Sequence, residues 1–356
     1  MPETRLARSL QFPDTPSLRY LPEGPVALGI GVFSWVAIQH GEGVTHGSLN
    51  LYRGDGSAGA AVGSGGSFEL PGRPGFAFPC GTPDRGIPDH FVVGCERELG
   101  LFQINGDGGR WHPFCSGIDQ DVDGTIINDG MVWEDNLIFG TKDLEFRTKK
   151  AGLYLWRGRD QTLIRLRDDQ ICSNGKAIRP LTAGPDAGLQ LIDIDSPTRQ
   201  VVGYPLDIER GRLGDPQVLI DLGGDPGVPD GAILTPDGRG LIVSLFRPEA
   251  AEYGETRLYD LDSGEPKIVW RTPGSPQNTC PALVAWGGGE GPSGTAVRLV
   301  ITTAVEHLSE SDRRRCPHAG EIFWGETDYA VADLPPTPRF PLPGPNGAPG
   351  RSVGPG

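Results

Sequence analysis

The chain has 356 residues, and its 46 acidic and 32 basic side chains give a formal net charge of −14. This balance argues against a nucleic-acid-binding protein, because there is no basic surface to replace the counterions of phosphate groups. No stretch approaches the roughly 18 apolar residues of a membrane span, and the N-terminal residues lack the apolar core of a signal peptide. We therefore expect a cytoplasmic protein, a monomer or a weak dimer, that binds neither nucleic acid nor membranes.

Short apolar or alternating runs recur along the whole chain. Most contain five to eight residues and are rich in Val, Ile, Leu and aromatic residues, which is typical of β-strands. Glycine and proline, with 54 and 34 residues, separate the runs and indicate many turns. Hardly any segment has a helical pattern; residues 305–315 are the candidate for one short helix, so the predicted fold is all-β. In chain order the runs are 31–38, 48–52, 90–95, 100–104, 136–141, 152–156, 189–194, 201–208, 240–246, 256–262, 298–304 and 321–325.

A turn residue followed by an apolar run also recurs at a nearly regular interval. The successive spacings are 51, 55, 45, 56 and 50 residues, and each holds about four strands with their turns, the size of a β-propeller blade. Six such units predict a six-bladed β-propeller over residues 1–333. The turn residues that mark the units are Gly24, Gly75, Gly130, Gly175, Gly231 and Pro281.

The last segment, residues 334–356, has a different composition. It is rich in proline and glycine and has almost no apolar periodicity. Such a segment buries too little surface to offset the entropy of ordering, so we expect a disordered C-terminal tail.

Several of the recurring turns place an acidic or amide side chain just before the glycine. Equivalent positions of successive blades surround the central channel of a propeller, so residues distant in sequence meet there. Glu23, Asn174 and Asp230 would then offer two carboxylates and one amide oxygen, which suit Ca²⁺, Mg²⁺ or Mn²⁺ and are tolerable for Zn²⁺. Asn128 and Asp129 occupy the corresponding turn of the third unit.

The tripeptide Pro-Asp-Gly occurs twice within residues 229–238. Its residue types alone predict a β-turn in both places. Asp230 begins an inner strand, whereas Asp237 belongs to the turn that follows that strand. The position within the blade therefore makes Asp230 the candidate ligand and leaves Asp237 as a turn residue.

Other catalytic patterns are missing from the sequence. The six cysteines have no CxxC spacing, the six histidines form no HxxxH or HxH set, and no GxSxG sequence occurs. These observations predict reduced, buried thiols and argue against a His/Cys zinc site and a serine hydrolase.

In their order, the motifs resemble those of the SMP-30/gluconolactonase/LRE-like family. The resemblance covers roughly residues 20 to 326. It rests on LPEGPV, INDGMVWEDNLIFGT, SNGKAI followed by LQLIDIDSPT, VPDGAILTPDGRGLIVSLF, NTCPALVAWGG, RLVITTAVEHLSE and HAGEIFWGE.

This resemblance implies a six-bladed propeller with one divalent cation in its central channel, calcium being favoured, and hydrolysis of sugar lactones or other lactones. It makes Glu23, Asn174 and Asp230 the metal ligands, with Asp230 also the candidate general base. Asn128, with Asp129 beside it, matches a substrate-binding position, and Glu145 falls near an acidic position that contacts substrate.

One residue departs from the family pattern. Sugar-acid lactonases of the family often have an arginine two residues before the Asn of NDG, where this chain has Ile126. An apolar side chain in place of a cationic, bidentate one puts aldonolactone specificity in doubt and favours a less polar lactone or ester.

The predicted activity is metal-dependent opening of a lactone by an activated water. Two alternatives remain open at this point. One is an aryl or phosphate esterase that uses the same metal site, and the other is a regulatory protein that binds the cation without catalysis.

Overall fold

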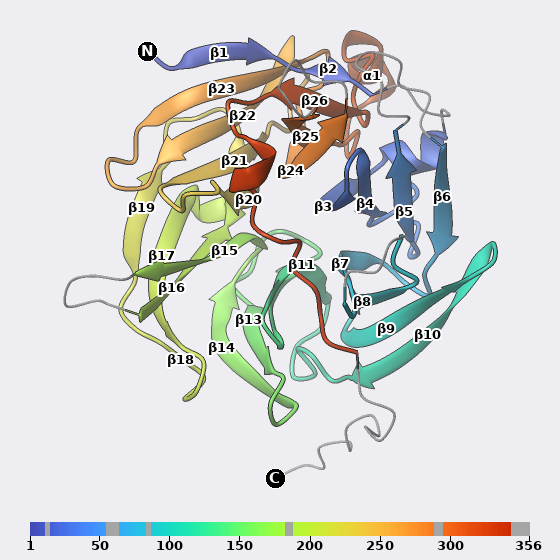
Figure 1. Cartoon of the computed structure of the whole chain (residues 1–356), viewed down its shortest axis with the longest axis vertical. Coiled ribbons are helices and arrows are strands. Elements are labelled where there is room, and N and C mark those ends of the chain that lie inside the picture. The colour runs from blue at the N-terminus through green and yellow to red at the C-terminus, as the bar shows by residue number, and fades with distance from the viewer. Residues whose placement is uncertain (11–14, 55–63, 83–86, 182–187, 288–294, 343–356) are drawn as a thin grey trace.

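The computed structural model describes residues 1–10, 15–54, 64–82, 87–181, 188–287 and 295–342. Its strands form six sheets arranged in a ring, so the prediction of an all-β, six-bladed propeller is confirmed (Figure 1). We number the blades 1 to 6 by the order of their innermost strands along the chain.

Each blade is an antiparallel sheet whose innermost strand comes first. Blades 1 to 3 contain β3 (Pro22–Gly29), β4 (Val32–Ala37), β5 (Ser48–Arg53) and β6 (Ser64–Glu69); β7 (Pro74–Pro79), β8 (His90–Cys95), β9 (Glu98–Asn105) and β10 (Gly108–Cys115); and β11 (Thr125–Trp133), β12 (Asn136–Asp143), β13 (Ala151–Arg157) and β14 (Thr162–Gln170). Blades 4 to 6 contain β15 (Ser173–Leu181), β16 (Gly188–Asp195), β17 (Gln200–Asp207), β18 (Arg212–Leu213) and β19 (Gln217–Asp221); β20 (Val228–Leu234), β21 (Gly240–Phe246), β22 (Tyr253–Asp260) and β23 (Pro266–Pro273); and β24 (Asn278–Gly287), β25 (Thr295–Thr303) and β26 (Ile322–Glu326).

The N-terminal segment closes the ring. β1 (Glu3–Leu6) adds a parallel strand to β23 of blade 5, and β2 (Arg8–Ser9) pairs with β26 of blade 6. Figure 1 shows both strands on the outer side of the last two blades. The two ends of the propeller are therefore joined through backbone hydrogen bonds, which protects outer strand edges that would otherwise be open.

Helical structure is sparse. The predicted short helix is present as α1 (Glu310–Arg315), and η1 (Pro16–Arg19), η2 (Ser196–Thr198) and η3 (Val331–Asp333) are single 3₁₀ turns. Ser309 caps α1 by accepting a hydrogen bond from the Asp312 amide. None of the helices in the described part of the chain is long and apolar enough to cross a membrane.

The recurring glycines lie where the innermost strands of neighbouring blades approach one another. A Cβ atom on Gly75 would lie 2.6 Å from the carbonyl oxygen of Ile127, and one on Gly175 would lie 2.6 Å from the carbonyl oxygen of Asp230. Gly24 has a φ of 54°, which side chains rarely tolerate. The sequence period thus reflects close packing around the ring axis as well as turn formation.

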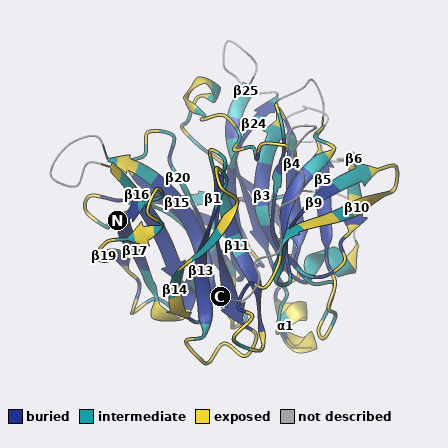
Figure 2. Cartoon of the chain, turned by 90° about the horizontal axis from the view of Figure 1, so that it is seen from below, coloured by how far each residue is buried: buried dark blue, intermediate teal, exposed yellow. Residues whose placement is uncertain are grey.

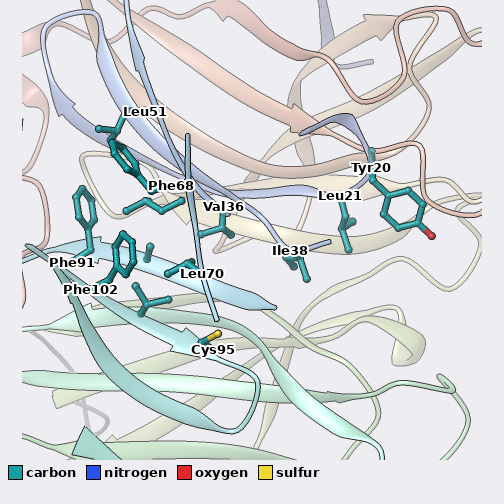
Figure 3. Packing of buried hydrophobic residues seen from close by; sticks show 14 residues of the cluster. Tyr20, Leu21, Val36, Ile38, Leu51, Phe68, Leu70, Phe91, Cys95 and Phe102 are labelled. Carbon is teal, nitrogen blue, oxygen red and sulfur yellow. The ribbon is translucent and has the colours of Figure 1, made fainter. Parts of the chain in front are cut away.

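Apolar clusters fill the spaces between adjacent blades. Figure 3 shows the cluster between blades 1 and 2, in which Val36 and Leu51 of one blade face Phe91 and Phe102 of the next. Comparable clusters occupy the other five blade interfaces. Figure 2 shows the same pattern for the whole molecule, with buried strands and exposed connecting segments. Burial between blades therefore holds the inner strands in place.

The C-terminal prediction needs a correction. Residues 334–342 are not a tail without structure, because Phe340 is 4% exposed and contacts Phe114 and Trp156. The amide of Gly81 donates to the carbonyl oxygen of Phe340 at 2.8 Å. In Figure 1 this segment runs from η3 across the ring toward β9 and β10. The composition of the segment did not reveal this order, because a single buried aromatic side chain is enough to hold residues 334–342 against the propeller. Residues 343–356 lie outside the part of the chain that the structure describes.

The substitution Phe340→Ala should lower the free energy of unfolding by about 3 kcal/mol, because the variant lacks the buried ring that packs against Phe114 and Trp156. The matched control is Leu342→Ala, since Leu342 is 42% exposed and should change stability by no more than about 0.5 kcal/mol. Urea unfolding of the full-length variants measures both values. Equal effects would show that residues 334–342 do not stabilise the propeller through Phe340.

Candidate functional site

The predicted site residues lie near the beginnings of inner strands. Glu23 and Asn174 are the second residues of β3 and β15, and Asp230 is the third residue of β20. The regular strand pairing is interrupted directly after Glu23 and Asn174, and around Asp230. Such β-bulges turn side chains out of the normal alternation and often occur beside active sites.

Asn128 and Asp129 of β11 complete a group that we call the axial cluster, together with Glu23, Asn174 and Asp230. The Asn128 amide donates to Asn174 Oδ1 at 2.7 Å and to the carbonyl oxygen of Ser173 at 3.0 Å. Asn174 in turn donates to Ser196 Oγ at 2.9 Å. These bonds fix the orientation of the Asn174 amide, the predicted neutral ligand.

The carboxylates of the axial cluster influence one another although they come from blades 1, 3 and 5. Burial raises the pKa of Glu23 well above its ordinary value, and the nearby charges of Asp230 and Asp129 raise it further. Burial also raises the pKa of Asp230, again with a contribution from Asp129. The pKa of Asp129 is raised by burial, with Lys176 acting in the opposite direction.

This charge pattern fits a divalent cation. Glu23 and Asp230 are only 8% and 7% exposed, and neither forms an ion pair with any residue that the structure describes. Glu23 accepts a hydrogen bond from the Gly24 amide at 2.9 Å. Buried carboxylates without a cationic partner are costly, and a bound cation together with the Asn174 oxygen would relieve that cost.

The described residues contain no group of three His, Cys, Asp or Glu side chains placed to hold a metal ion. The predicted ligand set differs from such a group because its third member is an amide. The burial and charge of its two carboxylates are the features that suit it to a cation.

The two Pro-Asp-Gly copies differ as expected in their surroundings. Asp237 is exposed and accepts hydrogen bonds from the Thr235 hydroxyl at 2.6 Å and from the Arg239 amide at 3.1 Å. These bonds lower its pKa, whereas the pKa of Asp230 is raised. Asp237 is thus a satisfied turn residue, and Asp230 is a buried acid without a cationic partner in the described chain.

Of the two remaining candidate substrate-binding residues, Ile126 is buried in the sheet and Glu145 is exposed. Ile126 is buried, 2% exposed, and is the cross-strand partner of Lys142 in β12. Glu145 lies on the exposed segment 144–150, which follows β12, and pairs with Arg147 at 2.5 Å. Among the described contacts, none links Glu145 to the axial cluster.

The segment 144–150 has a fixed backbone in spite of its exposure. The carboxylate of Asp143 accepts hydrogen bonds from the amides of Glu145, Arg147 and Thr148, and it pairs with Lys150 at 3.0 Å. Burial alone would raise the pKa of Asp143, but these donors hold it below its ordinary value. One buried carboxylate thus organises the whole segment.

Sequence reasoning missed Lys142 and Cys172. Cys172 Sγ accepts hydrogen bonds from Asn128 at 3.6 Å and Asn174 at 3.5 Å. Lys142 lies in a strand whose eight residues are all buried. The sequence did contain a signal for the burial of Lys142, because this lysine lies in the mainly apolar run NLIFGTKD.

The prediction of buried thiols is confirmed for Cys280, whose thiol is buried and whose pKa is raised by that burial.

A family comparison agrees with the geometry. Residues 21–304 match the model of the SMP-30/Gluconolactonase/LRE-like region. The chain belongs to this family. The match includes all five residues of the axial cluster and ends in the sixth blade, so the family's domain is the propeller itself.

Two curated relatives match about half of the chain. A Bacillus subtilis (strain 168) protein, provisionally named a sugar lactone lactonase, is 30% identical over 186 residues, which are 52% of this chain and 56% of the relative. An uncharacterised Sulfolobus acidocaldarius protein is 32% identical over 187 residues, which are 52% of this chain and 58% of the relative. The matched part thus spans little more than half the length of these relatives.

Solved structures share the fold at low sequence identity. A calcium-binding protein, regucalcin, from Agrobacterium tumefaciens has a TM-score of 0.69 at 21% identity, covering 91% of this chain and 95% of the other. A luciferin-regenerating enzyme has a TM-score of 0.66 at 19% identity, covering 91% and 96%. These similarities establish the propeller fold.

The raised pKa values of Glu23 and Asp230 predict how the metal-free protein responds to pH. Its folded state binds protons more tightly than its unfolded state, so stability falls as pH rises above the ordinary carboxyl range of about 4. In the presence of a chelator, Asp230→Asn should therefore have a higher melting temperature than the wild type at pH 8, and the difference should shrink at pH 5.

The matched control is Asp237→Asn, in the second copy of the same tripeptide. Because the pKa of Asp237 is lowered, this variant should not gain stability at pH 8. Melting temperatures in chelator over pH 5 to 8 measure the comparison. Identical pH profiles for the wild type and Asp230→Asn would contradict the electrostatic description of the axial cluster.

Proposed function

We propose that this protein is a metal-dependent lactonase whose cation is held by Glu23, Asn174 and Asp230. The single observation that carries the proposal is the pair of buried carboxylates, from blades 1 and 5, that has no cationic partner among the described residues. Family membership and the relative named for sugar lactone hydrolysis support the choice of reaction. Calcium is our first candidate, with Zn²⁺, Mg²⁺ and Mn²⁺ as alternatives.

The residues of the axial cluster suit hydrolysis of a cyclic ester. When bound, a divalent cation supplies polarisation of an ester carbonyl and stabilises negative charge on its oxygen. Asp230 is our candidate general base, which takes a proton from the attacking water. Water adds to the carbonyl carbon, the ring C–O bond breaks, and the released alkoxide takes up a proton.

Asn128 is the candidate substrate-orienting residue. Its amide nitrogen is engaged by Asn174 and Ser173, but within the described residues nothing donates to its Oδ1. That oxygen is available to accept a hydrogen bond from a substrate hydroxyl. Asp129, the next residue, accepts a hydrogen bond from the Gly130 amide at 2.7 Å, which fixes the orientation of its carboxylate.

The activity test is acid release from glucono-1,4-lactone in a pH-stat, with calcium or with chelator. Asp230→Asn and Glu23→Gln should lower kcat/KM by about 100-fold or more, because each removes a carboxylate from the proposed centre. Asp237→Asn, an exposed turn variant, should stay within about twofold of the wild type. Chelator should abolish the wild-type rate.

Other outcomes distinguish the alternatives. Turnover of aryl or phosphate esters without lactone hydrolysis would identify an esterase. A melting temperature raised by calcium without turnover of either class would identify a non-catalytic binding protein. Lactone hydrolysis that is insensitive to chelator would contradict the metal centre.

A further inference from the structure

Lys142 is a buried cation beside the axial cluster. It is 5% exposed and lies in β12 directly opposite Ile126 of β11. Side chains of directly opposed residues project from the same face of a sheet, with Cβ atoms about 5 Å apart. On its other side, Lys142 pairs with Cys172, which accepts hydrogen bonds from Asn128 and Asn174. The Lys142 side chain therefore begins next to the apolar side chain that occupies the expected arginine position.

The ammonium of Lys142 has no anionic partner within the described chain. Two neighbouring lysines are different: Lys176 pairs with Asp193 at 3.4 Å, and Lys150 pairs with Asp143 at 3.0 Å. The side chain of Lys142 makes no hydrogen bond or ion pair with any described residue. Among the described residues it lies near the ring of Phe146, whose centroid is 5.6 Å from Nζ, near the limit for a cation–π contact.

The charge of Lys142 acts electrostatically on the carboxylates of the proposed metal centre. It lowers the pKa values of both Glu23 and Asp230, which come from other blades. Lys142 is nevertheless not their ion-pair partner, and a cation bound by these carboxylates would leave the ammonium without an anion. A buried ammonium is costly when unpaired, so a partner supplied by a ligand would be bound favourably.

We propose that Lys142 is a substrate-binding residue that selects lactones carrying a carboxylate beside the ring that is opened. This inference rests on the proposed lactonase function. One unpaired ammonium matches the single charge of a carboxylate better than a doubly charged phosphate, given the acidic side chains around it. Ile126 alone suggests a substrate less polar than an aldonolactone. Lys142, its cross-strand partner, supplies a positive charge beside that position and favours an anionic substrate instead.

The test compares two lactones of the same ring size. Glucaro-1,4-lactone has a carboxylate where glucono-1,4-lactone has a CH₂OH group. Lys142→Met keeps an unbranched side chain one atom shorter than lysine and removes its charge. In calcium, it should raise KM for glucaro-1,4-lactone by about 10- to 100-fold, the effect of one charged hydrogen bond. KM for glucono-1,4-lactone should change by less than about threefold.

Lys149→Met is the matched control, because Lys149 is an exposed lysine on the segment 144–150 that follows β12. It makes the same change in net charge and should affect both lactones by less than about threefold. The rise in melting temperature with calcium should be at least as large in Lys142→Met as in the wild type, because the variant removes a positive charge near the carboxylates. Equal losses for the two lactones, no loss for either, or a lost calcium response in Lys142→Met would overturn the proposal.

A binding experiment separates this inference from the proposed activity. If the wild type hydrolyses neither lactone, the lactonase proposal fails, and calorimetry with glucarate and gluconate on the calcium-loaded protein tests Lys142 alone. Glucarate has one carboxylate more than gluconate, and Lys142→Met should weaken glucarate binding by about 10-fold or more while leaving gluconate binding unchanged. Equal weakening of both, or no binding of glucarate to the wild type, would overturn the role of Lys142.

Discussion

The close packing of inner strands around one axis is the constraint on which the rest of the structure depends. Glycines let the backbones approach, as at Gly175, where a Cβ atom would lie 2.6 Å from the carbonyl oxygen of Asp230. The same packing buries acidic side chains from blades 1, 3 and 5 in each other's neighbourhood. Like charges in a buried place are unfavourable, and this is the basis on which we propose a cation at the centre of the ring.

The surrounding blades make this repulsion tolerable. Apolar clusters at each blade interface, the N-terminal strands that pair with blades 5 and 6, and the segment anchored by Phe340 hold the ring together. The packed blades stabilise the fold, whereas the buried carboxylates of the axial cluster repel one another and have raised pKa values. This division of roles is common in proteins that keep a reactive site on a rigid scaffold.

Position within the blade, and not the local motif, separates structural from candidate functional residues. Asp230 and Asp237 share the tripeptide Pro-Asp-Gly, but only Asp230 lies at an irregular start of an inner strand. Likewise, Lys150 and Lys176 are paired with the carboxylates of Asp143 and Asp193, whereas Lys142 is not part of such a pair in the described chain. The side chain of Lys142 has no such partner among the described residues, which is why we propose it as the group that binds a substrate anion.

The sequence by itself determined the fold class and the number of blades, because strand patterns and glycine spacing are local and repeat from blade to blade. The same spacing singled out Glu23, Asn174 and Asp230 as candidate ligands. It also placed Asn128 and Asp129 in equivalent positions. The roles of these residues, and those of Glu145 and Ile126, stay predictions until activity is measured.

Only the tertiary structure decided which side chains are left without partners. The cross-strand register sets Lys142 opposite Ile126, and the ring brings Lys142 within electrostatic reach of Glu23 and Asp230. Phe340 is another case, because its burial depends on Phe114 and Trp156 from distant parts of the chain. Pairing and burial are properties of contacts between distant segments, and no local pattern records them.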